Sequence, residues 1–310
     1  MKRKDRETRG RSGTKTSHSD VSASPSQART RPRANADGSD TIIPHPSKRF
    51  GQNFLTDKRI IQRIVETLAP QPDETVVEIG PGRGALTRSL LEGAGHLVAI
   101  EFDRNLIPGL EESFGSKTNF KLVHSDALVT DFCDVIRPAT EARVVANLPY
   151  NIATAILQRL IEQRHCLTEM VLMLQKEVVD RITARPGSGE RGYLSVFVEC
   201  YCETEKLFDV APGSFRPAPK IWSSVLRLVF RPQPVDVPDE KLLWQVVSAG
   251  FAQRRKTILN NLRNAPSPLQ EIVKSHGGAS IVLCQAEVDL QRRAETLTLL
   301  EWSRIARCLE

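Results

Sequence analysis

Residues 75–91 read TVVEIGPGRGALTRSLL, and the class of fold follows from this stretch. Its first part, Thr75 to Ile79, is rich in β-branched residues, which is typical of a buried strand. Gly80, Gly82 and Gly84 follow with the spacing G-x-G-x-G, and residues 85–91 then predict a helix that stops before Gly93. Such a strand, glycine loop and helix are typical of an open α/β sheet whose loop lets the backbone approach a ligand closely.

Two later strands are each followed by an acidic residue. Residues 97–100 predict a strand that ends at Glu101, which lies 21 positions after Gly80 and so suits the two hydroxyls of a ribose. Residues 120–123 predict the next strand, and Asp126 follows it as a candidate acceptor for the amino group of adenine. The alternative for either residue is a solvated acid at a strand end. Because no G-x-x-x-x-G-K-[ST] motif is present, a neutral cofactor that carries a nucleoside fits better than a nucleoside triphosphate.

A fourth strand, residues 142–146, leads into the tetrapeptide Asn-Leu-Pro-Tyr. Pro149 keeps Leu148 out of the helical region, so we expect the Leu148 carbonyl to point outward as a free acceptor. Asn147 adds a side-chain carbonyl and Tyr150 adds a flat ring for stacking. Two acceptors and a ring suit a planar base with an amino group, although an ordinary strand-to-helix turn has similar residues.

The remaining pattern predicts the rest of the sheet and a helical end. A helix capped by Asp57 should precede the glycine loop, and a strand is predicted at 170–174. The last two strands are predicted at 193–202 and 223–230. Pro232, Pro234 and Pro238 indicate a linker before a helical region. That region contains three consecutive cations, which are a candidate RNA phosphate site or simply a solvated helix face: Arg254, Arg255 and Lys256.

Charge is concentrated at the N-terminus. Residues 1–48 hold 11 Lys/Arg and 5 Asp/Glu of chain totals of 43 and 37, so residues 49–310 hold 32 of each. The segment 1–47 is rich in Ser, Arg and Pro and is predicted to be a disordered basic tail, either a polybasic arm for phosphate backbones or a solvated extension. No apolar run is long enough for a membrane span, and no signal-peptide core is present, so we expect a cytoplasmic protein.

Metal chemistry is not expected from the cysteines and histidines. The chain has six of each, no pair of cysteines has C-x-x-C spacing, and the histidines are scattered. Cys200 and Cys202 should lie on one face of a strand as a buried pair. We therefore predict no metal site.

With these elements in view, the chain resembles the ribosomal RNA adenine dimethyltransferase family, most closely its bacterial small-subunit branch. The resemblance covers the chain from about residue 48 to its end. It is carried by these stretches: residues 48–55, VEIGPGRGALT at 77–87, IEFD at 100–103, SDAL at 125–128, NLPYNI at 147–152, QKEVVDRITA at 175–184, FRPAPK at 215–220 and QRRKTIL at 253–259.

The resemblance implies a class I S-adenosylmethionine-dependent methyltransferase, an α/β protein with a Rossmann-like seven-stranded sheet whose last hairpin is antiparallel. It implies a catalytic domain at 48–235 and a small all-helical, RNA-binding domain at 236–310. It places cofactor contacts at Asn53, Leu55, Gly80, Glu101, Asp126 and Asn147, catalysis at Asn147, Leu148, Pro149 and Tyr150, and RNA contacts at Arg254, Arg255 and Lys256.

The implied reaction is dimethylation of the exocyclic N6 amino group of two adjacent adenosines in the 3′-terminal hairpin of small-subunit ribosomal RNA. The implied partner of a monomeric enzyme is that RNA or the immature small subunit. Ile221-Trp222 and Asn-Ile-Ala-Thr-Ala at 151–155 depart from the usual family residues. The alternatives are methylation of large-subunit RNA, a non-catalytic RNA-binding role and an NAD-linked dehydrogenase, which would share the glycine loop and Glu101.

Overall fold

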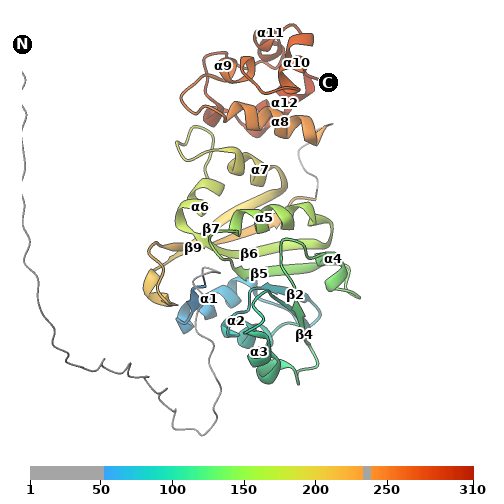
Figure 1. Ribbon diagram of the computed structural model, residues 1–310, viewed down its shortest axis with the longest axis vertical. Coiled ribbons are helices and arrows are strands. Elements are labelled where there is room, and N and C mark those ends of the chain that lie inside the picture. The colour runs from blue at the N-terminus through green and yellow to red at the C-terminus, as the bar shows by residue number, and fades with distance from the viewer. Residues whose placement is uncertain (1–51, 233–238) are drawn as a thin grey trace, which may run out of the picture. The chain divides into compact units, whose positions relative to one another are not determined.

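The computed structural model describes residues 52–232 and 239–310 (Figure 1). The predicted basic tail at 1–47 lies outside the described residues. So do residues 48–51 of the first family motif and residues 233–238 of the predicted linker.

A seven-stranded sheet with the order β4-β3-β2-β5-β6-β9-β7 forms the centre of the protein (Figure 1). The strands from β4 to β6 are parallel, and β9 runs antiparallel to both of its neighbours, as the predicted fold class requires. Their bounds are β2 (Thr75–Ile79), β3 (His96–Glu101), β4 (Phe120–His124), β5 (Ala142–Asn147), β6 (Leu167–Gln175), β7 (Cys202–Val210) and β9 (Ser223–Phe230).

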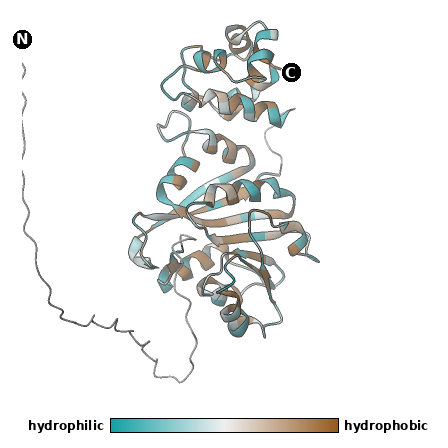
Figure 2. Ribbon diagram, in the orientation of Figure 1, coloured by the Kyte–Doolittle hydropathy of each residue, from teal (hydrophilic) through white to brown (hydrophobic). Residues whose placement is uncertain are grey.

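Apolar residues alternate between two faces of the sheet, and each face is covered by helices. Val76 packs in one cluster with α1 (Lys58–Leu68) and α2 (Ala85–Leu90), whereas Val77 packs in the other with α5 (Ala153–Glu162). Figure 2 shows the apolar strands between the helices. The helix α3 (Ile107–Phe114) packs at the β4 edge, and the second face also carries α4 (Phe132–Val135), α6 (Lys176–Ile182) and α7 (Tyr193–Tyr201).

The order of the strands reverses between β2 and β5. From β2 the chain adds β3 and β4 on one side, then returns to place β5 on the other side of β2. Ile79 pairs with Ala146, so Gly80, directly after β2, and Asn147, the last residue of β5, lie at adjacent strand ends. Ligands of open α/β sheets bind at this kind of switch point.

A small second sheet holds the segment that precedes α1. β1 (Phe54–Leu55) pairs antiparallel with β8 (Phe215–Arg216), and the Thr56 amide donates to the Ser214 carbonyl at 2.8 Å. Asp57 caps α1 by accepting from the Arg59 amide at 3.0 Å, as predicted. The second sheet therefore brings the end of the first family motif beside the proline-rich segment after the short 3-10 turn η3 (Pro212–Ser214).

Two elements differ from the sequence prediction. Residues 193–201 form the helix α7 and not a strand, and the strand β7 starts only at Cys202. Cys200 and Cys202 are both buried, but they lie on different elements and share no strand face. The cations at 254–256 lie in the exposed turn between α8 (Glu240–Gly250) and α9 (Ile258–Arg263), so they do not form a helix face.

Residues 239–310 contain only helices and connecting turns, which confirms the predicted helical character of this region. Trp302 of α12 (Leu299–Arg307) is fully buried and packs against Phe251 after α8. Trp244 of α8 forms an aromatic cluster with α7 through Tyr193, Phe197 and Tyr201. The other helices here are α10 (Leu269–Ser275), α11 (Ala279–Gln285) and the 3-10 turn η4 (Ala294–Thr296). Among the helices of the described residues, none has the length and apolar character that crossing a membrane requires.

Candidate active site

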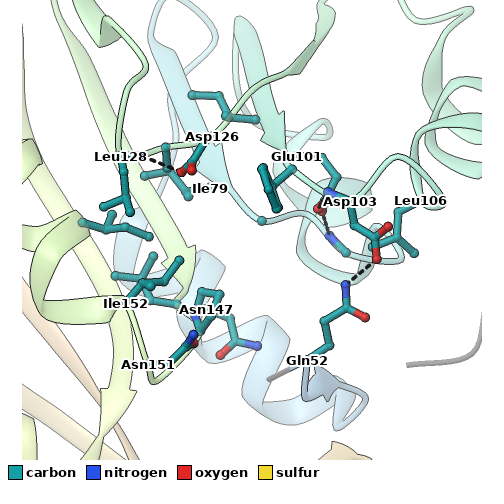
Figure 3. Close-up of a pocket in the computed structure, with 18 of the residues that line it drawn as sticks. Gln52, Ile79, Glu101, Asp103, Leu106, Asp126, Leu128, Asn147, Asn151 and Ile152 are labelled. Atoms are coloured by element: carbon teal, nitrogen blue, oxygen red, sulfur yellow. Dashed lines mark hydrogen bonds between the residues drawn. The ribbon is translucent and has the colours of Figure 1, made fainter. Parts of the chain in front are cut away.

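A cavity lies at the carboxyl ends of the central strands (Figure 3). It brings together predicted site residues from five separate stretches of the chain. Those that line it are Asn53, Gly80, Glu101, Asp126, Asn147, Leu148, Pro149 and Tyr150. Leu55 lies outside this group, since it is buried in β1 and lines an adjoining cavity that shares Gly80 and Asn147 with the first.

The glycine loop forms one wall of the cavity. Gly80, Gly82 and Gly84 have φ values of +68°, +60° and +76°, in the left-handed region that favours glycine. A Cβ at Gly82 would lie 3.0 Å from the Phe54 ring, whereas one at Gly80 would meet no atom within 4 Å. The loop therefore leaves open space above Gly80, next to the Asn147 side of the cavity.

Glu101 is nearly buried at the end of β3, with 6% of its surface exposed. Its carboxylate accepts from the Gly82 amide at 3.1 Å and from the Asp103 amide at 2.8 Å. Burial raises the pKa of the Glu101 carboxyl, and the two backbone hydrogen bonds partly offset that rise. Asp103 in turn accepts from the Gln52 side chain at 2.7 Å, which fixes the start of the described chain against this wall (Figure 3).

Asp126 lies on the opposite wall. One of its carboxylate oxygens accepts from the Leu128 amide at 2.9 Å (Figure 3). Its other oxygen has no hydrogen bond within the described residues, so it can accept from a ligand. The side chain is only partly buried, as a residue at the rim of a cavity should be.

The tetrapeptide Asn147–Tyr150 begins at the last residue of β5 and offers two carbonyl oxygens, those of the Asn147 side chain and the Leu148 backbone. The Asn147 amide group donates to the Asn53 carbonyl at 3.1 Å, which leaves its side-chain oxygen for another partner. Leu148 is buried and its N–H donates to the Met173 carbonyl at 3.2 Å, while its own carbonyl accepts no hydrogen bond from any described residue. The Tyr150 hydroxyl lies 2.7 Å from the Ser223 hydroxyl, which holds the ring, and burial raises its pKa.

Sequence reasoning missed one buried acid beside the loop. Glu78 is 1% exposed within β2, and the Thr87 hydroxyl donates to it at 2.7 Å. Burial, reinforced by repulsion from Glu101, raises the pKa of Glu78 to about 7, although the Thr87 hydrogen bond opposes the rise. A charged residue inside an otherwise apolar strand is the signal that could have identified it.

The three cations predicted to contact RNA lie elsewhere. Arg254, Arg255 and Lys256 are exposed and are absent from the lining of the cavity. Arg254 donates from its guanidinium to the Gly189 carbonyl, which lies in the loop between α6 and α7. They form a surface separate from the acceptor tetrapeptide.

The charge of the cavity limits its ligand. Three acids line it, Glu101, Asp103 and Asp126, and no described lining residue is Lys, Arg or His. A cavity of this kind suits a ligand with positive charge, hydroxyls and an amino group.

The strand order, the glycine loop at the switch point and this cavity define the class I methyltransferase fold. The chain belongs to the ribosomal RNA adenine dimethylase family, whose model matches residues 45–304. Membership confirms the resemblance and the enzyme class predicted from the motifs.

Individual relatives agree with this assignment. The chain is 42% identical over 260 residues to a ribosomal RNA small subunit methyltransferase A of Hahella chejuensis, covering 84% of this chain and 91% of the relative. It is 43% identical over 272 residues to the protein of the same name from a Geobacillus species, covering 85% and 91%.

Two solved structures share the fold. The 23S rRNA methyltransferase ErmE superposes with a TM-score of 0.62 at 26% identity, covering 83% of this chain and 99% of that one. A dimethyladenosine transferase from Plasmodium falciparum superposes with a TM-score of 0.67 at 24% identity, covering 81% and 95%.

Proposed function

We propose that this protein transfers methyl groups from S-adenosylmethionine to the exocyclic N6 amino groups of two adjacent adenosines in the 3′-terminal hairpin of small-subunit ribosomal RNA. One observation carries the proposal. In a single cavity, acidic residues that suit the cofactor lie together with the carbonyl acceptors of Asn147 and Leu148. The identity of the relatives named small subunit methyltransferase A supports the choice of RNA.

The residues present fit this cofactor. Glu101 is fixed by two backbone amides and suits the ribose hydroxyls, and Asp126 suits the adenine amino group. The open space above Gly80 accommodates the amino acid end, and the acids favour a cation over a phosphate. When bound, S-adenosylmethionine supplies an activated methyl group on a positively charged sulfur.

The acceptor tetrapeptide orients the target amine. The lone pair of an adenine amino group is delocalised into the ring, so the amine is a poor nucleophile. Acceptance of its two hydrogens by the Asn147 side chain and the Leu148 carbonyl would pyramidalise the nitrogen and aim its lone pair, while the Tyr150 ring stacks on the flipped base. Positioning of this kind lowers a barrier by about 7–11 kcal/mol, so no strong base is needed, and the proton leaves to water.

The exposed cations at 254–256 would bind phosphates of the RNA backbone, since phosphate contacts position a protein on its nucleic acid. The substrate would be the small-subunit RNA or the immature subunit, and the enzyme would act as a cytoplasmic monomer. The tail at 1–47 would add sequence-independent affinity for phosphates.

Three other functions are less well supported. An NAD-linked dehydrogenase would share the glycine loop and Glu101, but it would not explain the carbonyl acceptors of Asn147 and Leu148 in the same cavity. Methylation of large-subunit RNA is the stronger rival because the ErmE structure is similar over 83% of this chain. A binding-only role would leave the acceptors at Asn147 and Leu148 without a purpose.

The test is nucleoside mass spectrometry of ribosomal subunits from a strain that lacks this methylation, incubated with the protein and S-adenosylmethionine. We expect new N6,N6-dimethyladenosine in the small subunit, at two residues per particle. Dimethyladenosine in the large subunit alone would refute the proposed substrate. Cofactor binding without methylation of either subunit would favour the binding-only role.

A further inference from the structure

Two cysteines far apart in the sequence meet near the amino ends of β5 and β6. Cys133 of α4 and Cys166, which ends the 3-10 turn η2 (Arg164–Cys166), are joined by a disulfide with their Cα atoms 5.6 Å apart. Neither residue belongs to a family motif quoted above. His165 stands next to the pair, with its Nε2 atom 3.1 Å from the Cys133 sulfur.

The pair can be reached by a small reactant. A surface hollow is lined by both cysteines, His165 and Arg137. Cys133 is partly exposed, whereas Cys166 is 4% exposed. Attack from solvent is therefore expected at Cys133, and Cys166 is placed to resolve the product.

We propose that Cys133 and Cys166 are a reversible thiol modification site that reacts with a low-molecular-weight disulfide. The Cys133 thiolate, its proton taken by His165, attacks the disulfide, forms a mixed disulfide and releases one thiolate. The Cys166 thiolate then attacks the Cys133 sulfur, and the second small thiolate leaves as the protein disulfide forms. Two small thiolates are produced for each protein disulfide, so electrons balance. Paired cysteines in a reducing compartment are usually of this transient kind.

The bond closes a loop with a sequence separation of 33, and this loop contains the whole acceptor tetrapeptide at 147–150. It also fastens α4 to the end of α5 beside an existing polar clamp. The buried Gln163 side chain accepts from the Phe132 amide at 2.7 Å and donates to the Thr130 carbonyl at 2.9 Å. The Thr130 hydroxyl donates to the Asp126 backbone carbonyl at 2.8 Å, so these hydrogen bonds connect Gln163 to the backbone of the cavity residue Asp126.

Oxidation should therefore stabilise both the fold and the Asp126 wall. Closing a loop of this length raises stability, so reduction should lower Tm by about 5–10 °C. We also expect reduction to weaken S-adenosylmethionine binding about 5-fold. Only this cofactor readout rests on the proposed function; the disulfide and the Tm shift do not.

The experiment treats the reduced full-length protein with glutathione disulfide, and follows it by non-reducing peptide mass spectrometry, differential scanning fluorimetry and calorimetric titration with S-adenosylmethionine. The wild type and the control Cys284→Ser, which removes an exposed free cysteine, should both yield the disulfide-linked peptide of Cys133 and Cys166. Both should yield it again after reduction with dithiothreitol and a second treatment with glutathione disulfide. Cys133→Ser should form none and show no redox-dependent Tm. His165→Ala should form it at least about tenfold more slowly.

The proposal is overturned if glutathione modifies Cys284 while Cys133 and Cys166 stay unlinked. It is also overturned if the reduced protein binds one Zn²⁺ tightly at these residues and no longer oxidises, because the sulfurs and the imidazole would then be metal ligands. If the disulfide forms but cofactor affinity does not change, the modification site stands and its coupling to the Asp126 wall is refuted.

Discussion

Two buried carboxyl groups stand beside the glycine loop, and burial raises the pKa of each. Their hydrogen bonds differ, however. Glu101 accepts from two backbone amides at the cavity wall, whereas Glu78 accepts from Thr87 behind the loop. We therefore expect Glu101 to affect binding of the cofactor and Glu78 to affect stability.

Glu101→Gln should weaken S-adenosylmethionine binding by about 10- to 100-fold, because charge-assisted hydrogen bonds contribute about 1.5–3 kcal/mol each. The methylation rate at saturating cofactor should change little. Calorimetric titration and single-turnover rates measure the two quantities, with the exposed Glu112→Gln as the matched control. A slower saturated rate with unchanged affinity would assign Glu101 to the chemical step.

The raised pKa of Glu101 also predicts a pH dependence. The ionised form accepts the ribose hydroxyls, and it is lost at a higher pH than for an ordinary glutamate with a pKa of 4.5. Wild-type affinity should therefore fall as the pH drops from neutrality through this raised value. The affinity of Glu101→Gln should not fall over this pH range. Identical pH profiles of affinity for the wild type and the variant would contradict the assignment.

Glu78 should make stability depend on pH in the opposite sense to an ion-paired acid. Its pKa is about 7 in the folded protein, whereas an ordinary glutamate, as in the unfolded chain, has a pKa of 4.5, so between these values the folded state binds more protons. The free energy of unfolding should fall as the pH rises from 4.5 to 7, by up to about 3 kcal/mol, and then level off. Glu78→Gln should remove this slope in urea titrations; an unaltered slope would mean that other groups cause it.

At the scale of elements, local signals predicted the first half of the sheet well. The β-branched run at 75–79, its glycines and the Asp57 cap depend on neighbours in sequence, and each lies where it was expected. The strand predicted at 193–202 was wrong, because this run of residues is apolar enough to suit either a strand or a helix. Packing against α6 and Trp244 of α8 selects the helix, and sequence alone does not contain those contacts.

The residues that line the cavity were easier to predict than the long-range contacts that hold them in place. Glu101 and Asn147 end their strands and Asp126 follows the end of β4, so parallel topology alone brings them together. The bond from Asn147 to Asn53 and the disulfide between Cys133 and Cys166 join segments 94 and 33 residues apart, and no spacing rule predicts them. Pairings of this kind depend on the finished tertiary structure.

Two glycine substitutions test the account of the loop. Gly84→Ala should destabilise the protein by at least about 2 kcal/mol, because φ is +76° and the new Cβ would lie 2.4 Å from the Phe114 ring. Gly109→Ala, within α3, meets no atom within 4 Å and should stabilise by about 0.5–1 kcal/mol. Equal effects in urea unfolding would refute the steric argument.

Across the whole molecule, opposite charges lie on two separate surfaces. The cavity is acidic, whereas exposed cations gather at 254–256. Replacing Arg254, Arg255 and Lys256 by Ala should lower the slope of log K against log salt for RNA binding by about 2–3. Arg104→Ala with Lys117→Ala, two exposed cations elsewhere, should change the slope much less. An unchanged slope in the triple variant would make 254–256 an ordinary solvated turn.

We propose that the carbonyl groups of Asn147 and Leu148 orient an adenosine amine for methyl transfer. The most direct measurement is the single-turnover methylation rate of Asn147→Ala on small ribosomal subunits at saturating S-adenosylmethionine, with cofactor affinity measured in parallel. We expect a loss of at least about 100-fold in rate with a much smaller change in affinity. A rate equal to that of the wild type would contradict it.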